Sequence, residues 1–352
     1  MSRDLKFFEA LREAQDQCMA ADDGVYLMGL GVPDPTGIFG TTKGLQDKYG
    51  AARVMDMPLA ENAMTGIAIG SALTGMRPVM THQRVDFALT AMEQIVNQAA
   101  KWRYMFDGKH KIPLVIRMII GRGWGQGPQH SQSLQALFAH IPGLNVVMPT
   151  TAHDAKGLLI SAIESDDPVV MLEHRWLYGI SDSVPEDMYR VPLGKAHVMR
   201  EGDDVTLVGL SYMSLENLRA AELLAERGVS AEVIDLRSLR PLDEDTILMS
   251  VRKTGRVVVC DTANKMYGAS AEIVALVCEK AFDALKAQPE RVALPEHPAP
   301  TSPALSAGYY PRAGDIAGRV LSQMGRDVDD ALFSVPEGQN HDQPDPTFTG
   351  PF

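Results

Sequence analysis

Glu61 is the side chain whose position most suggests chemistry in this 352-residue chain. The surrounding segment, RVMDMPLAENAMTGIAIGSALTG, predicts a short strand over 53–57, a turn at Pro58 and then a helix. The helix dipole favours a carboxylate in the first turn. Three glycines in the helix each cost about 1 kcal/mol relative to alanine, which favours a closely packed neighbour. Glu61 is therefore a candidate site residue, and an ordinary N-terminal helix charge is the alternative.

His130 is the second candidate, because it ends a glycine-rich loop, GRGWGQG, that follows a predicted strand over 113–120. The loop is longer than a dinucleotide fingerprint and lacks the Gly-Lys-Ser/Thr of a phosphate loop. A histidine at the start of a helix can exchange a proton near neutral pH, although it can also serve only for capping or packing. The chain has no nucleophile elbow, no HExxH motif and no GDG segment. It therefore holds part of a site and lacks the rest.

The elements that must position these residues alternate between strand and helix, which predicts an α/β fold with mostly parallel sheets covered on both faces. The first half predicts helices over 4–20, 66–75, 87–105, 131–140 and 152–165, and strands over 25–30, 53–57, 77–82, 113–120, 145–148 and 168–173. The second half predicts strands over 205–210, 231–236, 256–260 and 291–294, and helices over 215–227, 244–252, 269–287 and 313–324.

The periodicity is interrupted by Pro, Asp, Ser and Gly between Tyr178 and Gly202, where we place a domain boundary. We therefore expect two doubly wound domains, over 1–190 and 204–326, joined by a linker over 191–203. A tail over 327–352, rich in Pro, Asp and Gln, is expected to be disordered or bound to a partner.

Composition limits the function classes. A net charge of −12, from 33 basic and 45 acidic residues, argues against nonspecific binding to nucleic acid or to an anionic membrane surface. No apolar run approaches the ~20 residues that span a bilayer. The three cysteines have no metal-type spacing, which favours a reducing, cytoplasmic location.

Several longer blocks resemble one family. They include RVMDMPLAENAMTGIAIGSALTGMRPV, DFALTAMEQIVNQAAKWRYM, GPQHSQSLQALFAHIPGLNVVMPTTAHDAKGLLISAI, DDPVVMLEH, VIDLRSLRPLD and GASAEI. In collinear order these blocks resemble the β subunit of the thiamine-diphosphate-dependent 2-oxo acid dehydrogenase E1 component, of the pyruvate and branched-chain type, within the transketolase-like superfamily.

This resemblance implies a pyrimidine-binding domain followed by a transketolase C-terminal-type domain. It implies an α2β2 heterotetramer with an E1 α subunit and a second β subunit, and acyl transfer to a lipoyl-bearing E2. Thiamine diphosphate would be shared with the α subunit, which would hold Mg²⁺. Glu61 matches the glutamate that bonds the aminopyrimidine ring, Phe87 matches an aromatic residue beside that ring, and His130 matches the histidine that faces the substrate.

A potassium ion is implied near Leu114, Ala162, Ile163 and Asp167, where it would fix the loop around His130. The alternative is that AIESDDP is only a helix end with an Asp-rich turn.

The chain also departs from the family pattern. The usual acidic pair after the first strand is replaced by GLGV at 29–32, and an apolar segment is replaced by THQRVD at 81–86. Arg122 and Trp124 stand in the glycine loop where small residues are common. We expect His82, Arg84 and Arg122, together with Gln129, to line a polar substrate pocket suited to an extra anionic or hydroxylated group. The alternative is that Arg84 pairs with Asp86 or with the partner subunit.

Three functions are therefore considered. The first is a subunit for oxidative decarboxylation of a 2-oxo acid. The second is acetoin cleavage or ketol transfer of the split-transketolase type. The third, of another class, is a non-catalytic scaffold subunit.

Overall fold

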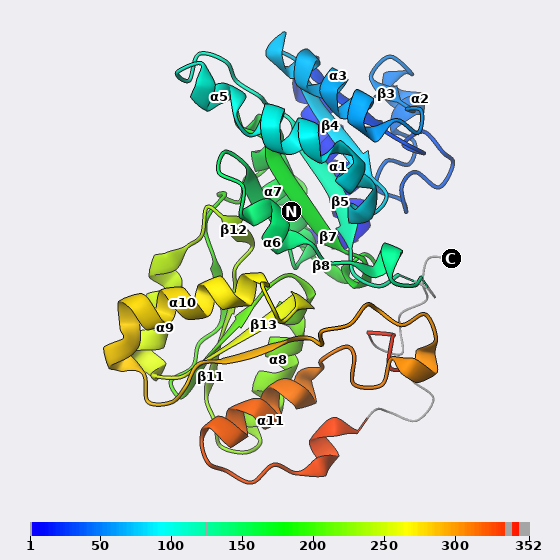
Figure 1. Cartoon of the computed structure of the whole chain (residues 1–352). Coiled ribbons are helices and arrows are strands. Elements are labelled where there is room, and N and C mark those ends of the chain that lie inside the picture. Colours follow the sequence, from blue (N-terminus) through cyan, green and yellow to red (C-terminus); the bar gives the residue numbers. More distant parts are fainter. Residues whose placement is uncertain (1, 124–125, 335–339, 345–352) are drawn as a thin grey trace.

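The chain forms two α/β domains in a computed structural model that describes residues 2–123, 126–334 and 340–344 (Figure 1). The first domain has a seven-stranded sheet of order β12-β6-β7-β5-β4-β2-β3, and the second has a five-stranded sheet of order β14-β13-β10-β11-β9. All neighbouring strands of these sheets are parallel except β12 against β6 and β9 against β11. This arrangement confirms the predicted fold class.

The elements of the first domain are β1 (Ser2–Lys6), α1 (Phe7–Ala21), β2 (Val25–Gly29), α2 (Leu45–Tyr49), β3 (Val54–Met55), α3 (Glu61–Leu73), β4 (Arg77–His82), α4 (Val85–Ala88), η1 (Leu89–Ala91), η2 (Gln94–Ala99), α5 (Trp102–Met105), β5 (Val115–Ile120), η3 (Gln129–Ser131), α6 (Gln135–Ala139), β6 (Asn145–Val147), α7 (Ala152–Glu164), β7 (Val169–His174), η4 (Arg175–Leu177) and β8 (Ser181–Pro185).

The following elements are β9 (His197–Arg200), β10 (Val205–Gly209), α8 (Tyr212–Ala225), β11 (Ala231–Asp235), β12 (Ser238–Arg240), α9 (Glu244–Thr254), β13 (Val257–Asn264), α10 (Ala269–Ala281), η5 (Phe282–Ala284), β14 (Glu290–Leu294), η6 (Pro303–Leu305), α11 (Ala313–Gln323) and η7 (Asp330–Phe333).

The central strands are apolar because both faces of each sheet are covered. Every residue of β5, β7, β10 and β11 is buried, as expected for parallel strands between two helical layers. One apolar cluster includes Val146 and Met148 of the first domain and Ile234 and Leu236 of the second. The two domains therefore share a continuous core, and β12 adds a strand from the second half of the chain to the first sheet.

Two predicted helices differ in the structure. Residues 2–6 form β1, paired antiparallel with β8, and the helix begins only at Phe7. The long helix expected over 87–105 is divided into α4, η1, the π-helix η2 and α5. Directly after the π-helix, the carbonyl oxygen of Ala100 lies so close to Gly143 that a Cβ at Gly143 would overlap it.

The predicted linker and tail both contain ordered contacts. The segment 191–203 includes β9, which pairs with β11. In the tail, η7 packs on α11, where a Cβ at Gly314 would overlap the carbonyl oxygen of Leu332. Further on, the guanidinium of Arg312 donates to the carbonyl groups of His341, Gln343 and Pro344. The described parts of the tail therefore lie on the chain itself.

Candidate functional site

The candidate site lies at one edge of the first sheet. Strands β2, β3, β4, β5 and β7 are parallel, so their carboxyl ends meet at the same edge, where open α/β sheets bind ligands. Glu61 follows β3, Phe87 follows β4, and His130 follows β5. The fold thus brings the three residues matched to the family's cofactor and substrate contacts to one edge.

Glu61 is the first residue of α3, which confirms its predicted place in the first helical turn. Its side chain is partly buried and has no hydrogen-bond partner among the described residues. The glycines of α3 permit close packing, as a Cβ at Gly66 would lie 3.2 Å from Oε1 of Gln94 in η2. A carboxylate at the sheet edge is therefore free to bond a ligand.

His130 is held by a neighbouring carboxylate. Its Nδ1 lies 2.8 Å from Oδ2 of Asp86, and its ring lies 5.3 Å from the Phe87 ring, centroid to centroid. With the carboxylate accepting at Nδ1, the neutral imidazole keeps an acceptor at Nε2. From the sequence, Asp86 is expected only as a partner for Arg84, so this orienting contact with His130 is found only in the structure. The one available signal was that Asp86 directly precedes Phe87.

The loop that lacks the family's acidic pair receives a carboxylate from elsewhere. The backbone N–H of Gly31 donates to Oδ1 of Asp56 at 2.9 Å, and Asp56 directly follows β3. Nε2 of Gln83 donates to the carbonyl oxygen of Leu30 at 3.1 Å. Hydrogen bonds thus join the loops after β2, β3 and β4.

Arg84 and His82 lie under this edge, both nearly buried. Nη1 of Arg84 donates to the carbonyl oxygen of Gly121 at 2.9 Å, and no ion pair to Asp86 forms. Nε2 of His82 has no partner among the described residues, and burial lowers the pKa of His82 to about 4. His82 is therefore neutral at physiological pH.

Arg122 is occupied in binding other parts of the chain. Its guanidinium is fully buried, donates to the carbonyl groups of Pro300 and Thr301, and forms a 2.6 Å ion pair with Asp342. It ties the glycine loop to the second domain and the tail instead of pointing to a substrate, which makes a direct substrate contact a poor fit. Gln129 is exposed on η3, and Trp124 lies outside the described residues.

The four positions expected near potassium already have protein partners. The carbonyl oxygens of Leu114, Ala162 and Ile163 accept from Val169 N, Ser165 N and Arg77 Nη1, and the Asp167 carboxylate pairs with Arg103. Leu114 precedes β5, whereas His130 follows it, and the six residues of β5 span about 20 Å. This separation argues against direct contact between such an ion and the His130 loop, and the fixing of that loop by the ion stays a prediction. The ion itself stays a prediction.

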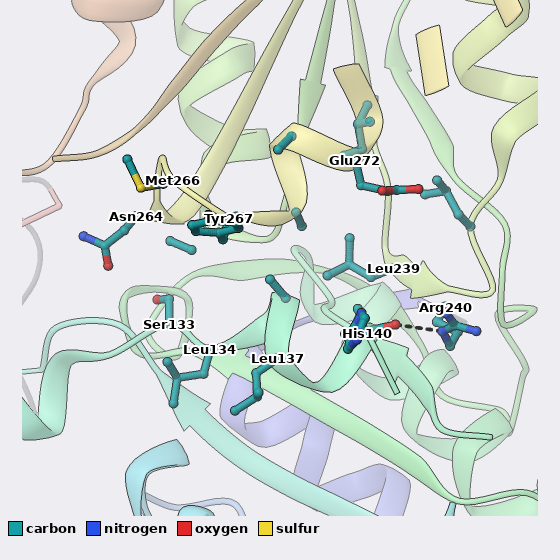
Figure 2. A pocket seen from close by; sticks show the side chains of 18 of the residues that line it. Ser133, Leu134, Leu137, His140, Leu239, Arg240, Asn264, Met266, Tyr267 and Glu272 are labelled. Atoms are coloured by element: carbon teal, nitrogen blue, oxygen red, sulfur yellow. Dashed lines mark hydrogen bonds between the residues drawn. The ribbon is translucent and has the colours of Figure 1, made fainter. Parts of the chain in front are cut away.

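A cavity of about 990 Å³ opens between the two domains next to this edge. In Figure 2, Leu134, just before α6, and Leu137, within it, lie across the cavity from Met266 and Tyr267, which follow β13. None of the predicted site residues lines the cavity. Met266 and Tyr267 are largely exposed.

Within the described residues, no group of three or more His, Cys, Asp or Glu is arranged to hold a metal ion. In the same part of the chain, no helix is long and apolar enough to cross a membrane.

Comparisons with known proteins agree with this architecture. Residues 3–180 match the family "Transketolase, pyrimidine binding domain", and residues 194–316 match "Transketolase, C-terminal domain". A solved structure described as "Split gene transketolase, inactive beta4 tetramer" superposes with a TM-score of 0.76 over 91% of this chain and 99% of that chain. At 24% identity this likeness shows the fold alone.

Named relatives are more similar in sequence. The β subunit of acetoin:2,6-dichlorophenolindophenol oxidoreductase of Cupriavidus necator is 45% identical, with 92% of this chain and 98% of that protein covered. The β-2 subunit of the mitochondrial pyruvate dehydrogenase E1 component of Oryza sativa is 44% identical, with 90% and 85% covered. The corresponding β subunit of Rickettsia bellii is 42% identical, with 89% and 96% covered. The chain belongs to the family of β subunits of thiamine-diphosphate-dependent 2-oxo acid dehydrogenase E1 components.

Proposed function

We propose that the chain is the β subunit of a heteromeric enzyme that decarboxylates a 2-oxo acid oxidatively and passes the acyl group to a lipoyl group. The observation that carries this proposal is that Glu61, which has no hydrogen-bond partner among the described residues, lies at the same sheet edge as the Asp86–His130–Phe87 group. A scaffold subunit without a catalytic role would not need a free carboxylate and an oriented imidazole at that place.

The residues present fit the pyrimidine half of thiamine diphosphate. Glu61 would bond the aminopyrimidine ring and Phe87 would pack beside it, while the cofactor would supply the stabilisation of the carbanion that decarboxylation requires. His130, with Nδ1 held by Asp86, would exchange a proton at Nε2 with the substrate or the incoming lipoyl group. The proposal places the diphosphate and Mg²⁺ on the α subunit.

The surface of α3 supports a heteromeric assembly. Leu59, just before the helix, is 74% exposed, and Ile67 within the helix is 57% exposed. Contact of these apolar side chains with water is unfavourable unless another subunit covers them. We propose an α2β2 heterotetramer in which α3 contacts another subunit, with a lipoyl-bearing E2 as the acceptor protein. Two of the three free cysteines are buried. The proposal also includes a cytoplasmic location.

Acetoin cleavage is the second candidate. Two relatives named acetoin:2,6-dichlorophenolindophenol oxidoreductase subunit beta, from Cupriavidus necator and Bacillus subtilis, are 45% and 42% identical to this chain. The same group of Glu61, Phe87 and His130 would serve either substrate, because both reactions use the same cofactor chemistry.

The test is to isolate the complex that the chain forms in its cell of origin and to identify the partner chain by mass spectrometry. The complex is then assayed with thiamine diphosphate, Mg²⁺ and an artificial electron acceptor against pyruvate, branched-chain 2-oxo acids and acetoin. We expect cofactor-dependent turnover of a 2-oxo acid. Turnover of acetoin alone would favour the second candidate, and a complex inactive toward all of them would contradict both.

A further inference from the structure

Two nearly buried arginines, Arg84 and Arg175, flank the end of β5. The proposed function assigns no role to Arg175. Arg84 and Arg175 are only 4% and 3% exposed. Arg84 lies two residues after β4, Arg175 directly follows β7, and β5 lies between these strands. Strands in a sheet are about 4.8 Å apart, so the two strand ends are separated by about 10 Å, a gap that two arginine side chains can close.

Neither guanidinium is satisfied by the described residues. Arg84 makes one hydrogen bond, to the carbonyl oxygen of Gly121, and its Nε is buried without a partner. The guanidinium of Arg175 makes no hydrogen bond in the described part of the chain, and its Nε is also buried. Its contacts are aromatic, with Cζ lying 4.6 Å from the Phe39 ring centroid and 4.4 Å from that of Tyr178.

The nearby carboxylates are committed to other groups. Asp86 holds His130, and Glu173 forms a 2.7 Å ion pair with Arg117 and accepts from the hydroxyl of Tyr178. Burial lowers the pKa of Arg84 to about 10, and burial together with the nearby charge of Arg84 lowers the pKa of Arg175 to about 9. Within the described residues, neither of these two positive charges has a carboxylate counter-ion, and buried charges are rarely left unpaired without a functional reason.

Two glycines of the loop after β5 lie close to the ends of the neighbouring strands β4 and β7. A Cβ at Gly123 would overlap the Arg84 guanidinium, and one at Gly121 would overlap the ring of His174. The glycines therefore let the loop that leads to His130 approach both strand ends. An arginine with a free Nε beside a Nη group presents the fork that carboxylate and phosphate oxygens bind bidentately.

We propose that Arg84 and Arg175 form a subsite for a second anionic group of the substrate, a carboxylate or a phosphate, at the end of the molecule away from the carbonyl that reacts. The inference rests on the proposed function and narrows its substrate class from 2-oxo acids in general to those with an acidic far end. The proposed subsite keeps Arg84 from the polar substrate pocket that the sequence predicts, and adds Arg175. Arg122 has a structural role instead.

The first experiment compares substrates of one chain length in the assembled complex. We expect 2-oxoglutarate to exceed 2-oxopentanoate in kcat/KM by about tenfold or more, as for a charge-assisted hydrogen bond. A matched 2-oxo-4-phosphonobutanoate assay shows whether carboxylate or phosphate is preferred. Arg175→Gln and Arg84→Gln should remove the preference mainly through KM, whereas Arg190→Gln, at an exposed ion pair with Glu164, should not.

Equal use of acidic and neutral substrates by the wild-type complex, or an equal loss for both in Arg175→Gln, would overturn the subsite. A complex that turns over no 2-oxo acid at all would instead contradict the proposed function. In that case the second experiment, which does not depend on activity, decides the subsite.

The second experiment measures thermal unfolding of the full chain with and without glutarate or inorganic phosphate. If Arg175 serves to bind a ligand, the Arg175→Met variant should unfold at the same or a higher temperature than the wild type, because the substitution removes an unpaired buried charge. Arg117→Met, which breaks a fully buried pair, should unfold at a lower temperature. One of the two anions should raise the unfolding temperature of the wild type and leave Arg175→Met unchanged. If Arg175→Met is destabilised like Arg117→Met and neither anion has an effect, Arg175 is only a structural cation stacked on aromatic rings.

Discussion

At the scale of single residues, the site depends on how two side chains are held. The carboxylate of Asp86 fixes Nδ1 of His130. The acceptor at Nε2 is therefore oriented by a hydrogen bond within the chain. Glu61 shows the opposite arrangement, because its carboxylate has no partner in the described part of the chain. One group is oriented within the chain, and the other is left available for a ligand.

Glu61→Ala should abolish decarboxylation in the assembled complex while the complex itself still forms, because in the proposed function the carboxylate bonds the cofactor, and it makes no hydrogen bond within the described residues. Turnover is measured with an artificial electron acceptor, and assembly is measured by size-exclusion chromatography. Glu222→Ala, at an exposed position of α8, is the matched control and should leave turnover unchanged. Normal turnover by Glu61→Ala would favour the scaffold interpretation.

Asp86→Asn should lower kcat by less than His130→Asn does, since Asp86 acts only through the histidine. General acid–base groups contribute about 10²–10⁴-fold, which sets the range expected for His130→Asn. In Asp86→Asn the amide can donate to Nδ1 instead of accepting from it, so the acceptor is no longer held at Nε2. The double variant should lose no more activity than His130→Asn alone. Additive losses would show that Asp86 acts independently of His130.

At the scale of elements, α3 combines small residues with an exposed outer face. Gly70 is exposed, and a Cβ at that position would meet no atom within 4 Å of the chain. Nothing in the isolated chain therefore requires glycine there, although glycine weakens the helix. A subunit packed against α3 would explain it.

Gly70→Ala should raise the free energy of unfolding of the isolated chain by about 1 kcal/mol and weaken its assembly with the partner subunit. Urea unfolding gives the first quantity and titration of the two subunits gives the second. Gly66→Ala is the internal control and should gain less stability, because its Cβ would lie 3.2 Å from Gln94 Oε1. Unchanged assembly of Gly70→Ala would place the subunit contact elsewhere.

At the scale of the whole molecule, the domain interface holds a buried carboxyl group. Asp235 ends β11 and accepts a hydrogen bond from the Ser214 hydroxyl at 2.9 Å, while its Oδ2 has no partner among the described residues. Burial and, to a smaller extent, the charge of Asp154 in the first domain raise the pKa of Asp235 to about 7. The folded chain therefore binds a proton there that the unfolded chain releases near pH 4.

This proton makes stability depend on pH. Between the unfolded value of 3.8 and about 7 the folded state binds more protons than the unfolded state, so the free energy of unfolding should fall as pH rises through this window. Asp235→Asn should flatten the dependence and be the more stable form above pH 7. Urea unfolding from pH 5 to 8 is the measurement, with exposed Asp283→Asn as the control. An unchanged slope in Asp235→Asn would assign the dependence to another group.

The sequence by itself determined the α/β class, the bounds of β4 and the place of Glu61 in the first turn of α3, because apolar runs, prolines and helix periodicity are local signals. Blocks of family-like sequence also indicated Phe87 and His130. Only the tertiary structure decided which side chains meet. Asp86 reaches His130 from a different strand end, and Arg84 and Arg175 flank β5 only because the strand order is β7-β5-β4. Strand order and the loop contacts that follow from it join residues far apart in the chain, so no local pattern of residues can reveal them.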